Sequence, residues 1–401
     1  MSTIHQMYCT HCTHGSSALE RRQGELADRM LGYSARGGSL EAGPLRRYYR
    51  QIERYVYYYL PRDTPTEAKL GLDASSAPRR LVRLPSADGL QLVAQVCYRP
   101  TDTQGRPGSY FAHVLFWEQR DGQAGSSSLE CLKLWGAPGW VEEDSPDIPF
   151  LLEPLRSLDH MFGRRRPAVD DDVLLGFLQS PAGGSFDDPG GVIPARWRQK
   201  PPAERIALLR DALLGFLQAD GSRQSLLLVV EPPVAALVFY GIVRLLPEGS
   251  LREAVSFSTF EPNTDRLCTT LAATQFYDSQ ATDLRPEVYR SGSPVINTFL
   301  GRRSETRRGE SPYAEVVLGR LLEKGWAAVD RTLDEMRAAG ARRIDDLQRL
   351  AALDRVVPVL LQTGQSPAGH PWRSSPVATG YLRQALGRAL GELPAPVTAV
   401  P

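Results

Sequence analysis

The spacing of apolar residues changes along the chain, and this change limits the possible folds more than any other feature. Over residues 90–97 successive side chains alternate between two faces, and residues 110–117 form a second, aromatic-rich run, so both segments are predicted strands. The turn residues at 101–108 predict that the strands pair antiparallel through a long hairpin. From Ser311 onward the apolar residues recur at helical spacing instead. The chain is therefore predicted to combine sheet-containing and purely helical parts.

The first 160 residues are predicted to form an α+β domain. Residues 45–59 carry apolar and aromatic side chains at helical spacing, with Pro44 near the start and Pro61 just past the end. We expect the apolar stripe of this helix to pack on the sheet that contains the two strands.

The second predicted domain, residues 161–305, is of the α/β kind. It opens with a stretch rich in Arg, Asp, Gly and Pro, which we interpret as a linker zone around a short apolar run. Helices are predicted near 202–217 and 234–246 on either side of a strand at 225–230, and two further strands at 254–260 and 269–276.

Residues 306–401 are predicted to be a helical region. Ser311 is a typical N-cap with Pro312 at the first helical position, and Gly325 and Gly340 end the first two helices. A third helix follows around 344–353, and a fourth is predicted from Ser375. A chain of 401 residues fits two or three domains of ordinary size.

Composition limits the environment and the partners. The chain has 47 basic and 46 acidic residues, so its formal charge of +1 provides no overall field for nucleic acid or an anionic membrane. The beginning of the chain has no signal-peptide pattern, and the most apolar later run, 226–246, is interrupted by charged and proline residues. Five cysteines do not form an even disulfide framework. We therefore expect a cytoplasmic protein without a membrane partner.

The densest group of potential metal ligands is Cys9, His11, Cys12 and His14. Zinc prefers such sulfur and imidazole ligands, and His113 and other cysteines are available elsewhere to complete a site. A strong zinc signature has a second pair at comparable spacing, which is absent here. The cluster is thus either a zinc site or a set of structural strand and turn residues.

The sequence bears on three kinds of chemistry. A cysteine hydrolase would require Cys9 or Cys12 beside His113, which otherwise is interpreted as a buried histidine with one satisfied hydrogen bond. Phosphate-binding loops are missing, so nucleotide hydrolysis by the chain itself is not expected. The arginines and tyrosines of 46–59 either line a stacking surface for single-stranded nucleic acid or, as the helical spacing favours, pack in a core.

Several segments carry a resemblance to a known family. They are Gln6-Met-Tyr-Cys-Thr-His-Cys-Thr-His-Gly15, Ser17-Ala-Leu-Glu-Arg21, Gly32-Tyr-Ser-Ala-Arg-Gly-Gly-Ser39 and Gly105-Arg-Pro-Gly-Ser-Tyr-Phe-Ala-His-Val-Leu115. In this order they resemble the N-terminal domain of the GTPase-associated protein 1 family. Leu245-Leu-Pro247 followed by Val255-Ser-Phe-Ser-Thr-Phe260 resembles the middle domain of the same family, and the helical end has no counterpart.

The resemblance implies a role in a bacterial conflict system built around a GTPase. Members of the family are encoded beside a GTPase and are thought to act as adaptors or regulators, and no catalytic residues are established for them. We therefore predict a non-catalytic adaptor with a separately encoded GTPase and other conflict-system proteins as partners, without a cofactor unless the cysteine–histidine cluster binds zinc. The candidate recognition residues are Tyr33, Arg36, Ser39, Arg106 and His113. A hydrolase and a nucleic-acid sensor are the alternatives.

Overall fold

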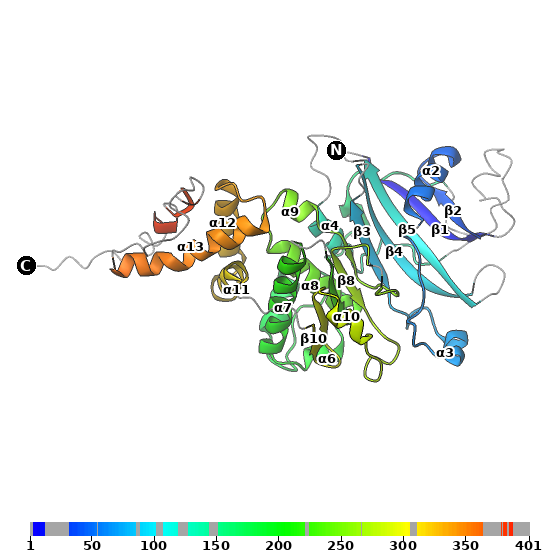
Figure 1. Ribbon diagram of the computed structural model, residues 1–401. Coiled ribbons are helices and arrows are strands. Elements are labelled where there is room, and N and C mark those ends of the chain that lie inside the picture. The colour runs from blue at the N-terminus through cyan, green and yellow to red at the C-terminus, as the bar shows by residue number, and fades with distance from the viewer. Residues whose placement is uncertain are drawn as a thin grey trace, which may run out of the picture. The chain divides into compact units, whose positions relative to one another are not determined.

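The structure is a computed structural model that divides into two compact units (Figure 1). Unit 1 comprises Met1–Val243 and Ala254–Thr306, and unit 2 comprises Arg244–Glu253 and Arg307–Pro401. The residues described are 3–12, 32–53, 55–85, 89–101, 107–118, 127–143, 151–220, 224–265, 267–304, 311–363, 378, 380–382 and 385–387.

A single ten-stranded sheet runs through unit 1, in the order β10-β9-β6-β8-β7-β3-β4-β5-β1-β2. The strands are β1 (His5–Cys12), β2 (Gly32–Gly38), β3 (Arg80–Pro85), β4 (Leu90–Thr101), β5 (Pro107–Glu118), β6 (Leu226–Val229), β7 (Phe257–Ser258), β8 (Leu271–Thr274), β9 (Val295–Asn297) and β10 (Arg302–Arg303). Helices and 3₁₀ turns of this unit are α2 (Ala42–Ile52), α3 (Thr66–Gly71), α4 (Ser128–Lys133), η1 (Leu158–Met161), α5 (Asp171–Gln179), α6 (Ala195–Arg198), α7 (Pro202–Asp220), α8 (Pro232–Arg244) and α10 (Pro286–Arg290).

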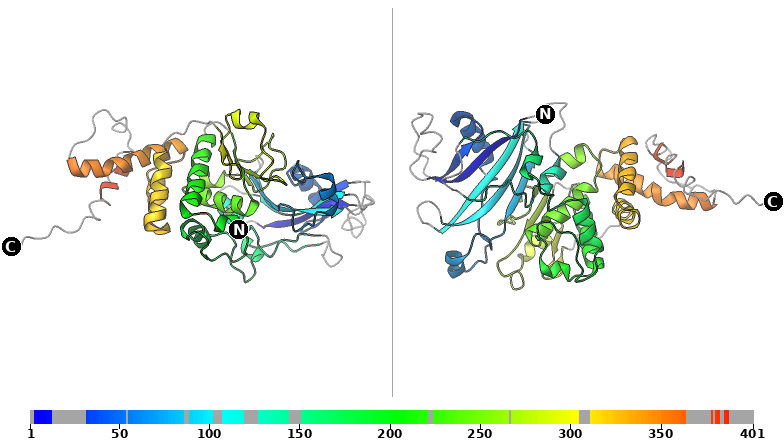
Figure 2. Two further views of the ribbon diagram at one scale, coloured as in Figure 1. Left: turned by 90° about the horizontal axis from the view of Figure 1, so that it is seen from below. Right: turned by 180° about the vertical axis from the view of Figure 1, so that it is seen from behind.

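The antiparallel half of the sheet confirms the predicted strand pair. β4 and β5 pair antiparallel from Leu90 opposite Glu118 to Thr101 opposite Pro107, and β1 continues the sheet beside β5. Helix α2 covers one face of these strands (Figure 2), where Leu45, Tyr49 and Ile52 join the buried strand residues in one apolar core. The packing of this helix on the sheet was predicted correctly.

Helix α2 is shorter than predicted, because it ends at Ile52 and not near residue 59. The following carbonyl groups are used outside the helix: the buried Arg80 side chain donates to the carbonyl oxygens of Tyr55 at 2.6 Å and Tyr57 at 3.0 Å. These contacts hold the segment after α2 against β3.

The other half of the sheet contains the parallel strands expected of an α/β domain. β6 lies between β8 and β9 and pairs parallel with both. The predicted helices are present as α7 and α8, and α8 is buried on almost all sides. A Cβ atom on Gly241 of α8 would come within 2.8 Å of Leu209 of α7, so this glycine permits the close approach of the two helices.

The stretch interpreted as a linker zone is a packed part of unit 1. Its apolar run forms α5, which begins with an N-cap in which Asp170 accepts a hydrogen bond from the Val173 backbone at 2.9 Å. Arg166 donates to both Asp170 and Asp187 at 2.6 Å. The Arg, Asp and Gly residues that suggested flexibility therefore cap the helix and cross-link its flanks.

Unit 2 consists of helices, as predicted for the C-terminal region. Its elements are α9 (Ser250–Glu253), α11 (Pro312–Lys324), α12 (Trp326–Ala338) and α13 (Ile344–Thr363). The unit also includes residues 244–253, which were assigned to the middle domain by their position in the sequence. Arg244 binds both carboxylate oxygens of Asp330, and the Tyr313 hydroxyl donates to the Leu245 carbonyl. The predicted fourth helix lies largely outside the described residues.

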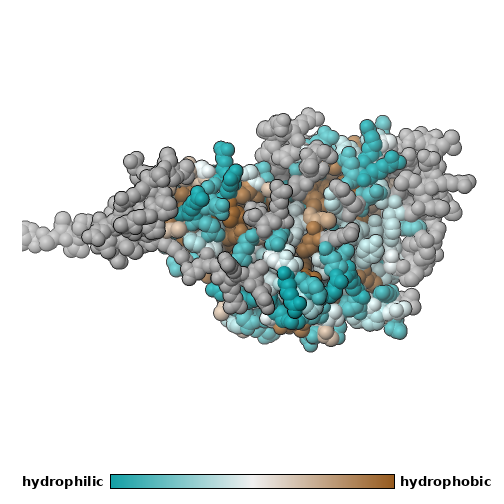
Figure 3. Space-filling model, viewed as in Figure 1, coloured by the Kyte–Doolittle hydropathy of each residue, from teal (hydrophilic) through white to brown (hydrophobic). Residues whose placement is uncertain are grey.

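The predicted fold class, an α+β chain of several domains with a helical end, is confirmed. The proposed boundary at residue 160 falls inside unit 1 and stays a prediction. Within the described ranges, no helix is both long and apolar enough to cross a membrane. Hydrophilic residues cover most of the coloured surface seen in Figure 3, and apolar residues show there in small areas.

Replacing Ser311 with alanine should destabilise the α11–α13 pair. The buried Ser311 Oγ accepts from the Ala314 backbone at 3.1 Å and from the Gln348 side chain of α13 at 2.7 Å. Losing this cap should cost about 1–2 kcal/mol. Hydrogen exchange of α11 and α13 amides should then speed up by roughly 5–30-fold. The exposed Ser250 provides a control, since Ser250→Ala should leave the exchange rates nearly unchanged.

Candidate functional site

Tyr33 joins the edge strand β2 to the end of the β4–β5 hairpin. Its ring stacks on the ring of Tyr110 with 4.2 Å between centroids and an interplanar angle of 1°, and its hydroxyl lies 3.3 Å from the Ser109 Oγ. His11 of β1, directly opposite Tyr33 in the register, meets the same ring edge-on at 5.4 Å. We call His11, Tyr33, Ser109 and Tyr110 the Tyr33 corner. Tyr33 itself is half-buried.

Arg106, a further candidate recognition residue, is a near neighbour of Ser109 in the sequence. It lies outside the described residues, directly before β5, which begins at Pro107. Ser109, two residues further into β5, is the contact of Tyr33. Of these two candidate residues, the structure therefore places Tyr33 alone.

Arg36 and Ser39 lie on or just after β2 but serve different contacts. Arg36 is buried, and its positive charge opposes the rise in the pKa of the Tyr8 phenol that burial causes. Ser39 Oγ accepts a hydrogen bond from the Gln6 backbone at 2.8 Å and lies 3.3 Å from His5 Nδ1. Ser39 thus ties the end of β2 to β1.

His113 is buried, and both ring nitrogens are hydrogen-bonded. Nδ1 accepts from the Val141 backbone at 3.2 Å, so the proton lies on Nε2, which donates to the Gln6 side chain at 3.1 Å. Burial lowers the pKa of His113 to about 3. A neutral imidazole in this position links β5 to β1 and to the segment after α4. Sequence reasoning anticipated the burial of this histidine but only one of its two hydrogen bonds.

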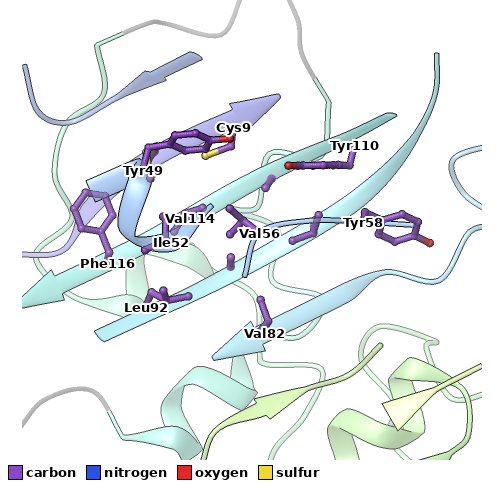
Figure 4. Packing of buried hydrophobic residues seen from close by; sticks show 14 of the residues in the cluster. Cys9, Tyr49, Ile52, Val56, Tyr58, Val82, Leu92, Tyr110, Val114 and Phe116 are labelled. Atoms are coloured by element: carbon purple, nitrogen blue, oxygen red, sulfur yellow. The ribbon is translucent and has the colours of Figure 1, made fainter. Parts of the chain in front are cut away.

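The potential zinc ligands are only partly described, and the described ones serve other contacts. Cys9 lies in the apolar core beside the ring of Tyr49, on the face that α2 covers (Figure 4). His11 packs on Tyr33. Cys12 ends β1 with its side chain outside the described residues, where His14 also lies. Among the described residues, no group of three or more potential ligands could hold a metal ion.

Cys9 and His113, one of the two pairs that a cysteine hydrolase would require, lie on opposite faces of the sheet. In the β1–β5 register Cys9 lies opposite Ala112, and Tyr8 lies opposite His113. Successive side chains of a strand point to opposite faces. Cys9 therefore faces the core under α2, whereas His113 shares the other face with Tyr8, whose ring it meets at 4.7 Å.

Two of the tyrosines near α2 pack inside the domain, as the helical spacing favoured, whereas Tyr59 is 67% exposed. Tyr49 and Tyr58 are buried in the apolar core, and the Tyr48 hydroxyl donates to Glu118 at 2.6 Å. Arg47 and Arg50 are exposed on α2.

Sequence reasoning missed a buried ionic network where the antiparallel and parallel strands meet. Arg80 of β3 pairs with Glu261, which follows β7, at 2.8 Å, and both side chains are at most 3% exposed. Tyr57 donates to the same carboxylate at 3.1 Å, and Ser258 Oγ accepts from Arg80 at 3.1 Å. The available signal was an arginine at the start of β3, but its partner lies 181 residues away in the sequence.

Comparison with known proteins identifies the antiparallel part of the chain. Residues 3–157 match the family model described as GTPase-associated protein 1, N-terminal domain type 2. This range includes β1 to β5, α4 and the whole Tyr33 corner. No curated protein matches the chain. The N-terminal part of the chain, residues 3–157, therefore belongs to the GTPase-associated protein 1 family.

Proposed function

We propose that the chain is a non-catalytic adaptor that binds a separately encoded GTPase within a bacterial conflict system. The observation that carries this proposal is the match of residues 3–157 to a domain described by its association with a GTPase. A fold or family by itself does not specify an activity, so the site residues must supply the rest of the argument.

The candidate catalytic groups make contacts within the domain, and this supports a binding role. Cys9 is packed in the core, and both ring nitrogens of His113 form hydrogen bonds within the domain. A general base needs a nitrogen within reach of a substrate proton, and this arrangement leaves His113 as a structural link. These residues build the domain around a rigid sheet.

The Tyr33 corner is the proposed contact surface for the GTPase. A half-buried tyrosine held by stacking loses little conformational freedom on binding and offers both an apolar ring and a hydroxyl. Arg106, next to this corner in the sequence, would add a positive charge that can bind an acidic side chain of the partner. Binding through a loop end supported by a sheet is a common arrangement.

A nucleotide-resolved pull-down tests the adaptor role directly. The purified chain is mixed with the GTPase encoded beside it, loaded either with GDP or with a non-hydrolysable GTP analogue, and the zinc content of the chain is measured in parallel. Retention of the GTPase in one nucleotide state, without stoichiometric zinc, supports the proposal. No retention in either state together with one zinc per chain would overturn it in favour of a zinc-dependent hydrolase.

Tyr33→Ala should weaken GTPase binding by about 10–100-fold, since aromatic anchors typically carry 1–3 kcal/mol of binding energy. Titration calorimetry or surface plasmon resonance gives the affinity. Tyr33→Phe keeps the stacked ring and should lose much less. Tyr277, an exposed tyrosine outside the family domain, is the matched control. Equal binding by Tyr33→Ala and Tyr277→Ala would place the contact elsewhere.

A further inference from the structure

Two exposed tyrosines lie on segments that one turn of unit 1 holds together. Tyr59 is 67% and Tyr277 is 49% exposed, and they are two of the three large apolar side chains exposed among the described residues. Residues 61–64 form a turn closed by a backbone hydrogen bond of 3.0 Å. Asp63 in this turn accepts from the Tyr277 backbone at 2.9 Å. Tyr59 precedes the turn by two residues, at most about 7 Å of chain, so both rings belong to adjoining parts of the surface.

Further polar contacts fix the backbone on both sides of this turn. Asp63 also accepts from the Asp278 backbone at 3.0 Å and from the Thr282 hydroxyl at 2.8 Å. Arg62 donates to Asp265, which lies in the segment after β7, at 3.3 Å. The two exposed rings therefore project from segments that are already ordered, and a partner that binds them need not order this backbone first.

The charged side chains that join the two segments neutralise one another. Asp265 forms ion pairs with both Arg62 and Arg285. Together with Asp63 they comprise two positive and two negative groups. A surface for a strongly charged partner usually carries an excess of the opposite charge. A surface of balanced charge can instead face a second copy of itself without like-charge repulsion.

We propose that this junction surface, composed of Tyr59, Arg62, Asp265, Tyr277 and Arg285, is the interface of a homodimer. In a twofold-symmetric dimer every contact occurs twice, so two different features on one surface can each meet the other across the axis. Tyr59 of one protomer packs on Tyr277 of the partner subunit, and the same contact forms again with the roles exchanged. Tyrosine is enriched at such contacts. The inference does not rest on the proposed function, because the Tyr33 corner is centred on the edge strand β2.

Sedimentation velocity of the full chain over a dilution series measures the dissociation constant of the dimer. Tyr59→Ala and Tyr277→Ala should each raise this constant by about 10–100-fold, because each substitution removes an aromatic anchor from both protomers. Leu151→Ala is the matched control, since Leu151 is 62% exposed and lies outside the junction surface, and it should leave the constant unchanged. A wild-type chain that stays monomeric at every concentration, or a dimer that neither tyrosine substitution weakens, would overturn the proposal.

Cross-linking tests which residues meet across the axis. Tyr59→Cys and Tyr277→Cys are made separately in a background of Cys12→Ser and Cys268→Ser, in which the three remaining cysteines are buried. A short bismaleimide should join the two variants when they are mixed, because the mixed dimer retains one intact contact between Tyr59 and Tyr277. Either variant alone should cross-link much less. Cross-linking of Tyr59→Cys alone that equals that of the mixture would contradict the proposed pairing.

Discussion

Replacing Glu261 with glutamine is expected to lower the free energy of unfolding of unit 1 by about 3–5 kcal/mol, which is the cost typical of leaving one charge of a buried ion pair unpaired. Arg80 and Glu261 are 3% and 2% exposed, and they join β3 to the segment after β7. The substitution keeps the size of the side chain and removes only the charge. Arg80 would then remain buried without a counterion.

Urea unfolding followed by tryptophan fluorescence measures this loss. The matched control is Asp265→Asn, because Asp265 is 34% exposed and its partners Arg62 and Arg285 are 53% and 64% exposed, so each pair should contribute no more than about 1 kcal/mol. If Glu261→Gln costs no more than Asp265→Asn, the buried pair does not hold the two halves of the sheet together. Replacing both partners, as Arg80→Met with Glu261→Leu, should recover part of the loss.

Acid should destabilise unit 1 through His113. Its pKa in the folded state is about 3, below the ordinary value of 6.5 expected for the unfolded chain. Between these values the unfolded state binds the additional proton, so the stabilising contribution is complete above pH 6.5 and is lost as the pH falls toward 3. The slope approaches 1.4 kcal/mol per pH unit, or roughly 3 kcal/mol by pH 4.

The measurement is the free energy of unfolding between pH 7 and pH 4 for the wild type and for His113→Gln. The variant should be less stable at pH 7, since the Val141 contact is lost, but its stability should fall less steeply on acidification. His5→Gln is the control: burial lowers the pKa of His5 and Glu118 opposes the shift, and the ring is only half-buried. Parallel acid profiles for His113→Gln and the wild type would contradict the assignment.

Much of the secondary structure could be predicted because it depends on neighbours in the sequence. The alternation that defines β4 and β5, the Ser311 cap of α11 and the glycine that ends it are all local patterns. The end of α2 was mispredicted, and the segment after it is held by Arg80, from another strand, which binds the Tyr55 and Tyr57 carbonyl groups. The supposed linker zone was misjudged in the same way, since its charged residues are paired with one another.

The candidate site shows the same division. Cys9, His11 and His113 could be selected from the sequence because cysteine and histidine can bind metal or act in catalysis. Tyr33 and Arg106 were selected from the family resemblance. Whether Cys9 could reach His113 depended on the register of β1 and β5, and one residue of register decides which face of a sheet a side chain occupies. Neither the composition nor the spacing of residues in the sequence predicts that register.

By itself, the sequence determined the kinds of element, the order in which they follow, the helical character of the end and the family of residues 3–157. Only the tertiary structure decided that β3 and β7 join two groups of strands into one sheet, that residues 244–253 belong with the helical unit, and that Arg80 finds Glu261. The physical reason is the sequence distance over which each interaction acts. Periodicity and capping depend on residues a few positions apart, whereas strand register and buried ion pairs depend on segments that are far apart in the sequence and meet only in the folded core.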